Sequence, residues 1–251
     1  MVGLPPFPSW PDEDPAIQVC LVVAHRNLDH RVSTLRAGPV MTEKNKAEEG
    51  VATAEPLILA SGSATRAKML RGAGVTIETA VPAIDEGELK ASLKQEGAPA
   101  ARVAETLAEL KAQRISARFP GCLVLGGDQM LECEGLWLDK PETREAAREQ
   151  LKQLRGRSHS LITSAVLVRN GERIWHTTDR AELRMRAFTD DFLERYLDEA
   201  GEDVLHSVGA YQLEGLGAQL FERVTGDFFT ILGLPLLPVL AILREHGIVD
   251  R

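Results

Sequence analysis

Short apolar runs alternate with helical periodicities from residue 57 onward, and this alternation limits the folds open to the chain more than any other feature. Leu57–Ala60 is fully apolar and ends at small residues, and residues 123–125 repeat that pattern. Between the two runs, Val103, Leu107 and Leu110 recur at the spacing of one helix face. Strands that alternate with helices form a sheet covered by helices. The sequence therefore predicts an α/β fold.

A hairpin is expected late in the chain, because two β-rich runs, residues 158–169 and 173–186, are joined by Asn170 and Gly171. A hairpin pairs its strands antiparallel, whereas strand–helix–strand units pair them parallel, so we expect a mixed β-sheet flanked by helices. Pro141 fits the first position of a helix, and Gly126 is expected to break its strand. Further elements are expected as strands over residues 75–81 and 123–128, and as helices over residues 99–118, 141–154, 190–200 and 235–246.

Composition and charge exclude several classes of protein. The 251 residues carry 29 basic and 37 acidic side chains, and this net charge of −8 argues against a nucleic-acid partner. The most apolar run, residues 231–243, contains Gly233 and two prolines and is too short for a membrane span. The chain does not begin with a basic and then apolar leader, so we expect no membrane association and a cytoplasmic location.

Residues 1–55 differ from the rest of the chain. They hold a Pro-rich opening, one apolar run at residues 17–24 and a long polar stretch. One strand-like run buries too little apolar area to offset the ordering entropy of such a segment. We therefore expect a mobile N-terminal extension over residues 1–55, with Met41 as a candidate functional start, followed by one domain over residues 56–251.

The turn after Leu57–Ala60 is a candidate anion site. Ser61, Gly62 and Ser63 are small enough for the backbone to approach a ligand, and the N–H groups at a helix start attract an anion. Arg66 can add a two-pronged contact to a phosphate. The same residues also fit a capped turn with a surface arginine, so the pattern alone leaves both roles open.

Asp128 is a candidate catalytic group, because it directly follows an apolar strand and glycines clear the space beside it. A carboxylate there can bind Mg²⁺ or activate a water molecule, and the alternative is a turn aspartate. Lys140 precedes the helix expected at Pro141, where a cation opposes the helix dipole unless it serves a bound anion. A solvated lysine fits this position equally well.

A glycine-rich stretch over residues 209–217 contains side chains that could read a nucleotide base, namely Tyr211, Gln212 and Glu214. A loop that connects core strands is the alternative. His159 is expected to be a core residue. The sequence signatures of serine hydrolases, P-loops, dinucleotide-binding turns and zinc proteases are absent from the chain.

Taken in order, these segments resemble the Maf family of nucleotide pyrophosphatases over residues 57–247. The opening is similar to the family's LILASxSPRR motif, although Thr65 stands where the family has its first arginine. Residues 154–159 are similar to the family's LSGRxH, with a departure at Arg155. The other matching positions are Ile84-Asp85-Glu86, Lys111-Ala112, Gly127-Asp128, Lys140-Pro141, Gly209-Ala210-Tyr211, Glu214-Gly215, Gly226-Asp227 and Gly233-Leu234-Pro235.

The resemblance implies a Maf/Ham1-like (inosine triphosphatase-like) fold with a cleft between two lobes, usually in a homodimer. It implies hydrolysis of a nucleoside triphosphate between the α and β phosphorus atoms to a monophosphate and pyrophosphate, with Mg²⁺ or Mn²⁺. Asp128 would be the catalytic carboxylate that binds metal or activates water, and Glu86 would help to coordinate the metal. Because the chain is acidic, its cations must converge locally on the phosphates. Phosphate and pyrophosphate would be bound by Ser61, Ser63, Arg66, Lys111 and Lys140.

Three positions, Thr65, Gln129 and Glu214, bear on the choice of nucleotide. In the branch of the family that acts on dTTP and UTP, the first arginine goes with Thr after the catalytic Asp and Gln in the late loop. Gln129 and Glu214 instead match the branch associated with 7-methyl-GTP, which however favours a large aromatic at the position of Thr65. A carboxylate at Glu214 suits the N1–H and N2–H₂ donors of guanine, so we expect a preference away from dTTP and UTP.

The family's older association with septum formation leaves a second class of function open. A nucleotide-binding regulator of cell division would bind nucleotide with little or no hydrolysis, whereas an enzyme would release pyrophosphate. The intact Asp128, Lys111 and Lys140 favour the enzyme.

Overall fold

The computed structural model describes residues 56–250, and within them the chain forms a mixed sheet of seven strands. The strands are β1 (Leu57–Ala60), β2 (Ile77–Thr79), β3 (Leu123–Cys133), β4 (Leu136–Leu138), β5 (Ser158–Arg169), β6 (Glu172–Met185) and β7 (Phe221–Thr225). Their order is β2-β1-β3-β5-β6-β7, with β4 paired to β3 beside this path. β1 pairs parallel with β2 and β3, and the other pairs are antiparallel, which confirms the predicted mixed sheet.

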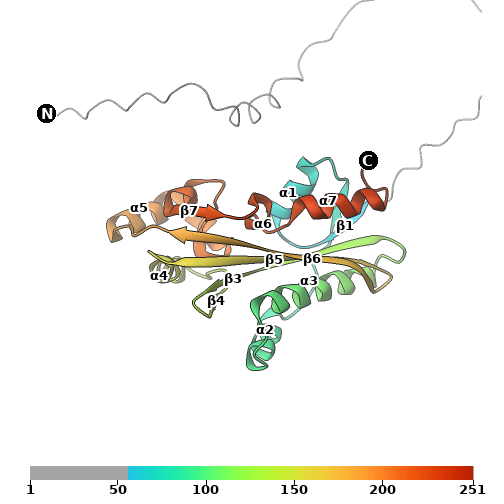
Figure 1. The fold of residues 1–251 in the computed structure, drawn as a ribbon, viewed down its shortest axis with the longest axis horizontal. Coiled ribbons are helices and arrows are strands. Elements are labelled where there is room, and N and C mark those ends of the chain that lie inside the picture. Colours follow the sequence, from blue (N-terminus) through green and yellow to red (C-terminus); the bar gives the residue numbers. More distant parts are fainter. Residues whose placement is uncertain (1–55, 251) are drawn as a thin grey trace, which may run out of the picture. The chain divides into compact units, whose positions relative to one another are not determined.

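Helices cover both faces of this sheet. They are α1 (Ala64–Gly72), α2 (Glu86–Gln95), α3 (Ala100–Ser116), α4 (Arg144–Leu154), α5 (Asp190–Ala200), α6 (Phe228–Ile231) and α7 (Leu236–Glu245). Figure 1 shows α1, α6 and α7 on one face and α2 and α3 on the other. In β1, Leu57 and Leu59 pack in the core shared with α1 and α7, while Ile58 packs in the core under α3. Because β1 is buried on both faces, its sequence is apolar throughout.

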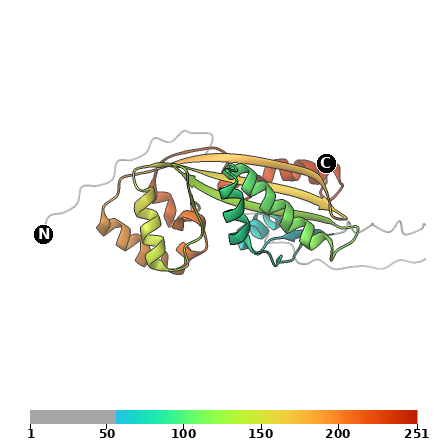
Figure 2. The same cartoon turned by 90° about the horizontal axis from the view of Figure 1, so that it is seen from below.

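The long strands β5 and β6 extend along two groups of helices, and Figure 2 shows these groups separated from each other. We call the group formed by α1, α2, α3 and α7 the first lobe. The second lobe contains α4, α5 and three short 3₁₀ turns, η1 (Gly201–Leu205), η2 (Val208–Ala210) and η3 (Leu216–Leu220). It has its own core, to which α5 contributes the buried Leu193, Tyr196 and Leu197.

β3 continues through its glycines, so the prediction that the strand breaks at Gly126 is wrong. A Cβ on Gly126 would lie 2.0 Å from the carbonyl oxygen of Ala108, and a side chain is therefore impossible where α3 packs on the strand. Gly127 lies under the side chain of Arg66. These glycines permit close approach, and Asp128 sits in the middle of an eleven-residue strand.

α4 begins three residues later than the sequence suggests. Thr143 is its N-cap, with extended backbone and a side chain that accepts a hydrogen bond from the N–H of Ala146, so Pro141 lies outside the helix. β2 is likewise shorter than the expected strand over residues 75–81. The helices α2 and α6 and the strands β4 and β7 were not expected from the sequence.

The expected hairpin is present as β5 and β6, and Asn170 and Gly171 both have positive φ, as a two-residue turn of this kind requires. The helix expected over residues 190–200 is confirmed as α5. The predictions for residues 1–55 and for Met41 fall outside the described residues. None of the helices within residues 56–250 is both long enough and apolar enough to span a bilayer.

Candidate active site

A pocket of about 610 Å³ opens where one edge of β3 loses its neighbours. β1 pairs with β3 as far as Gly126, and β4 pairs with the same edge only from Leu131 onward. Between these positions, no described strand covers the edge. Asp128 and Gln129 both line the pocket, although successive residues of a strand point to opposite faces of a sheet. The gap in the sheet is what lets them share one cavity.

Asp128 is held by Lys111, which reaches it from α3. The Nζ of Lys111 lies 2.6 Å from Oδ1 of Asp128 and 2.8 Å from Oε1 of Glu86 at the start of α2. Burial raises the pKa of Asp128, while the charges of Lys111 and Arg66 oppose that shift. The three residues that the sequence treats separately, Glu86, Lys111 and Asp128, therefore form one cluster.

The second carboxylate oxygen of Asp128 is free to bind a ligand. Oδ2 is buried and has no hydrogen-bond partner among residues 56–250. A buried, unpartnered carboxylate oxygen beside Glu86 suits a hard divalent cation such as Mg²⁺ or Mn²⁺. The described residues contain no group of three or more His, Cys, Asp or Glu that could hold a metal ion. Such a cation would therefore take its other ligands from substrate and water.

Arg66 is fixed over β3 by two hydrogen bonds. Its Nε donates to the carbonyl oxygen of Gly233 at 2.6 Å, and its Nη1 donates to Oγ of Ser61 at 3.1 Å. Burial lowers the pKa of Arg66, and the charges of Asp128 and Glu86 partly offset that effect. The guanidinium is thus positioned in the pocket before any ligand binds.

The serines shape the turn that leads into α1. Ser63 is the N-cap and accepts from the N–H of Arg66, and Oγ of Ser61 accepts from the N–H of Ser63. Because both oxygens act as acceptors, their hydroxyl hydrogens are available for an anion. The turn is therefore a capped helix start that also faces the pocket, and the two roles do not exclude each other.

Lys140 also lines the pocket, but the reason that the sequence suggested for it is wrong. Because α4 begins at Arg144, Lys140 does not stand immediately before a helix N-terminus. Partial burial and the nearby charges of Arg66 and Lys111 lower the pKa of Lys140. These three cations repel one another, and a bound anion would relieve the repulsion.

Lys90 is a pocket residue that the sequence did not reveal. It lies on α2, and its Nζ pairs with Oδ1 of Asp139. Burial alone would lower the pKa of Lys90, but the hydrogen bond to Asp139 and the charge of that carboxylate raise it. The sequence feature that could have predicted α2, and with it Lys90, is the helix-capping residue Asp85, which accepts a hydrogen bond from the N–H of Glu88.

The described lining of the pocket holds as many acidic as basic side chains. The expected cations do converge there, but each has carboxylates near it, so the cleft is not simply cationic. A divalent cation beside Asp128 would tip the balance toward anion binding. The basic residues are Arg66, Lys90, Lys111 and Lys140, and the acidic ones are Glu86, Asp128, Asp139 and Glu214.

A family model described as Maf-like protein matches residues 56–246, which is most of the chain. The chain belongs to the Maf family. A relative named nucleoside triphosphate pyrophosphatase from Paramagnetospirillum magneticum is 57% identical over 190 residues, covering 76% of this chain and 98% of that protein. One of the same name from Granulibacter bethesdensis is 52% identical over 190 residues, covering 76% and 96%. A relative named 7-methyl-GTP pyrophosphatase from Rhizobium meliloti is 47% identical over 194 residues, covering 77% and 98%.

The three positions that bear on nucleotide choice all line the pocket of this Maf chain. Thr65 lies in the first turn of α1, and Gln129 lies on β3 next to Asp128. Glu214 is exposed and follows η2 in the second lobe. The pocket thus contacts both lobes, with the cluster around Asp128 at its first-lobe end.

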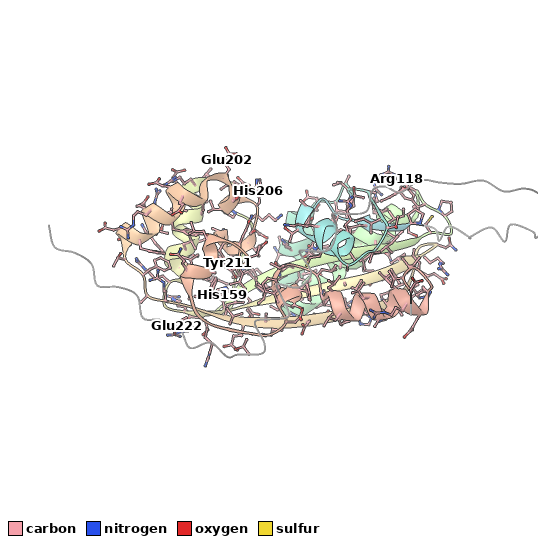
Figure 3. All side chains as sticks on the ribbon, turned by 90° about the horizontal axis from the view of Figure 1, so that it is seen from above. Arg118, His159, Glu202, His206, Tyr211 and Glu222 are labelled. Atoms are coloured by element: carbon pink, nitrogen blue, oxygen red, sulfur yellow. The ribbon has the colours of Figure 1, made fainter. Side chains whose placement is uncertain are left out.

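Tyr211 closes the second-lobe end of the Maf pocket and is held from behind by His159. The Nε2 of His159 and the hydroxyl of Tyr211 lie 2.7 Å apart, and Figure 3 shows the two residues next to each other. Burial lowers the pKa of His159 to about 4, so the imidazole is neutral near pH 7. His159 is therefore a core residue, as the sequence predicts, and it supports a residue of the pocket.

Proposed function

We propose that the chain hydrolyses a nucleoside triphosphate to the nucleoside monophosphate and pyrophosphate. The observation that carries this proposal is the buried Asp128, which binds Lys111 with one oxygen and leaves the other oxygen unpartnered in the pocket. Membership of the Maf family and relatives named nucleoside triphosphate pyrophosphatase support it.

Asp128 orients and activates the attacking water in this reaction, and the burial that raises its pKa makes it a better base. Asp128 and Glu86 would hold a divalent cation, which would neutralise charge on the phosphates. Lys111 keeps Asp128 in place through its 2.6 Å contact. In-line attack at phosphorus depends on such positioning and charge neutralisation more than on a covalent nucleophile.

The remaining donors of the pocket bind the triphosphate. Arg66, fixed by Gly233 and Ser61, presents a planar group suited to phosphate oxygens. The hydroxyls of Ser61 and Ser63 donate from the start of α1. Lys140 neutralises charge on the departing pyrophosphate, since burial and the charges of Arg66 and Lys111 lower its pKa and a bound anion would favour its charged form.

The substrate that fits best is a guanine nucleotide, such as GTP or 7-methyl-GTP, in preference to dTTP and UTP. Glu214 offers a carboxylate that can accept from the donors on the guanine edge, and it lines the pocket with Gln129. Two relatives at 47% identity are named 7-methyl-GTP pyrophosphatase, which supports this choice. Turnover of dTTP equal to or faster than that of guanine nucleotides would refute it.

A coupled pyrophosphate assay on the wild type and on Asp128→Asn tests the activity. The substitution keeps the shape of the side chain, removes its charge, and should lower turnover by orders of magnitude, about 1,000-fold. If Asp128→Asn releases pyrophosphate at the wild-type rate, the proposed role of Asp128 is wrong. If neither protein hydrolyses any nucleotide, yet both bind it and keep an effect on cell division, the chain is a nucleotide-binding regulator. Homodimeric assembly and a cytoplasmic location remain predictions.

A further inference from the structure

The amide of Gln129 can take only one orientation. Its Nε2 lies 3.0 Å from the carbonyl oxygen of Thr230 and 3.1 Å from that of Ile231, both at the end of α6. Backbone carbonyls accept hydrogen bonds and cannot donate them, so the NH₂ group of the amide must face α6. The other end of the amide, the acceptor Oε1, is left for the pocket that Gln129 lines.

Thr163 reinforces this orientation from the neighbouring strand. It lies directly opposite Gln129 in the β3–β5 register, and its Oγ1 is 2.9 Å from Nε2 of Gln129. The hydroxyl of Thr163 donates to the carbonyl oxygen of Thr230 at 2.9 Å, so its oxygen can only accept from Gln129. A flipped amide would place Oε1 against three acceptors at once.

Thr230, which supplies one of these acceptors, is itself fixed. Thr230 is fully buried, its N–H donates to Oδ1 of Asp227 at 2.9 Å, and its hydroxyl donates to Oδ2 of Asp179 at 2.7 Å. Asp179 lies opposite Thr163 in the β5–β6 register, so Gln129, Thr163 and Asp179 form one row across three strands. Every partner in this row has its hydrogen-bonding role determined.

The position of Gln129 indicates which part of a nucleotide it faces. Gly127, two residues earlier on the same face of β3, lies under Arg66, and Leu131, two residues later, belongs to the core of the second lobe. Gln129 therefore lies next along this face of β3 after the residue under Arg66, in the direction of the second lobe. Phosphate oxygens are acceptors and would be repelled by Oε1, whereas base N–H and ribose O–H groups are donors.

We propose that Oε1 of Gln129 accepts a hydrogen bond from a donor of the nucleoside, and that Thr163 is the positioning residue that helps to impose this polarity. The proposal rests on the proposed function, because it names how the same pocket selects its nucleotide. It requires the pocket to discriminate against nucleotides that lack the donor concerned.

The test compares nucleotides that differ by one donor. GTP and ITP differ at the base 2-amino group, and GTP, 2′-deoxy-GTP and 3′-deoxy-GTP differ at the ribose hydroxyls. The wild type should prefer the donor-bearing member of one of these pairs by about 10-fold in kcat/KM, as one hydrogen bond allows. The pair that shows the preference identifies the base or the ribose as the source of the donor.

Variants then separate the acceptor from its orientation. Gln129→Met, which removes the acceptor, should lower the preference to about 2-fold or less. Thr163→Val should reduce the preference by about 3-fold, and Thr163→Ser, which restores the hydroxyl, should keep it.

Calorimetry on each variant measures in parallel the affinity for non-hydrolysable α,β-methylene analogues of the same nucleotides. These affinities test the donor preference even if the chain hydrolyses nothing, so the failure of the proposed function would not hide the result. An unchanged preference in Gln129→Met or in Thr163→Val overturns the proposal. So does a wild type that binds GTP, ITP, 2′-deoxy-GTP and 3′-deoxy-GTP with equal affinity.

Discussion

At the first-lobe end of the pocket, Arg66, Lys111 and Asp128 are charged side chains that lie close together, whereas at the second-lobe end His159 and Tyr211 form a neutral, buried pair. Burial disfavours the charged forms of the side chains at the first-lobe end, because it raises the pKa of Asp128 and lowers that of Arg66. At the neutral end, His159 and Tyr211 are joined by a hydrogen bond, and burial keeps the imidazole uncharged. The difference indicates that the first-lobe end is suited to the charged part of a ligand, while the His159–Tyr211 pair forms a neutral wall suited to an uncharged part.

Replacing Lys111 with Met should have the largest effect on stability at pH 7, because it leaves Asp128 buried without its cation. We expect the free energy of unfolding at pH 7 to fall by about 3 kcal/mol, as for other buried pairs that lose one partner. Pyrophosphate release should fall by about 100-fold or more. Denaturant unfolding and the coupled assay measure the two effects, and Arg114→Met, an exposed position on the same helix, is the control.

The double variant Asp128→Asn with Lys111→Met sharpens the result. Removing both charges should restore most of the lost stability but none of the activity, since the cost lies in an unpaired buried charge. A single Lys111→Met variant as stable as Arg114→Met would show that the charged end carries no such cost.

The neutral end should instead reduce the stability of the fold at acidic pH. Burial lowers the pKa of His159 to about 4, whereas an unfolded histidine titrates near 6.5. The unfolded state therefore takes up the proton first, so the stability present above pH 6.5 is lost as the pH falls, by about 3 kcal/mol at pH 4. His159→Gln should remove this part of the slope when unfolding is measured between pH 7 and pH 4.

His206→Gln is the matched control for the acid experiment, because His206 is exposed in the second lobe. It should leave the slope of stability against pH as it is in the wild type. The same slope in His159→Gln and the wild type would mean that His159 is not held neutral.

Arg66→Lys tests whether the charged end needs the shape of its cation as well as the charge. A lysine cannot donate to Gly233 and Ser61 and still present a planar face to phosphate, so KM should rise by about 10-fold. Arg71→Lys, on the exposed last turn of α1, should not change KM. Equal KM values for the two variants would contradict a positioned guanidinium.

The sequence predicted the charged end better than the rest of the site, and the reason is physical. Leu57–Ala60 followed by small residues and Arg66 is a local pattern, and so is the hairpin at Asn170 and Gly171. Lys90 escaped notice because α2 has no fully buried residue and only two apolar side chains, Leu89 and Leu93, that pack on the core. The partnership of Gln129 with Thr163 depends on strand register over 34 residues, which no local pattern encodes.

Gly127→Ala should produce the smallest effect, and it is the most sensitive test of whether the two ends of the pocket act independently. A Cβ there would lie 3.3 Å from Nε of Arg66 and 3.5 Å from its Cδ, so the guanidinium must move by a few tenths of an ångström. We expect KM to rise by about 3-fold with less than about 1 kcal/mol change in stability. Gly72→Ala, where a Cβ meets nothing within 4 Å, is the control and should leave KM unchanged.

The rise in KM for Gly127→Ala should be the same for GTP, ITP and the deoxy nucleotides, because Arg66 contacts the phosphates that all of them share. Variants of Gln129, two residues along the same face of β3, should instead change the ratio between those nucleotides. If Gly127→Ala changed that ratio as well, a shift of Arg66 would have been transmitted to the nucleoside. The two ends of the pocket would then form one coupled unit, and the contrast between a charged end and a neutral wall would have to be abandoned.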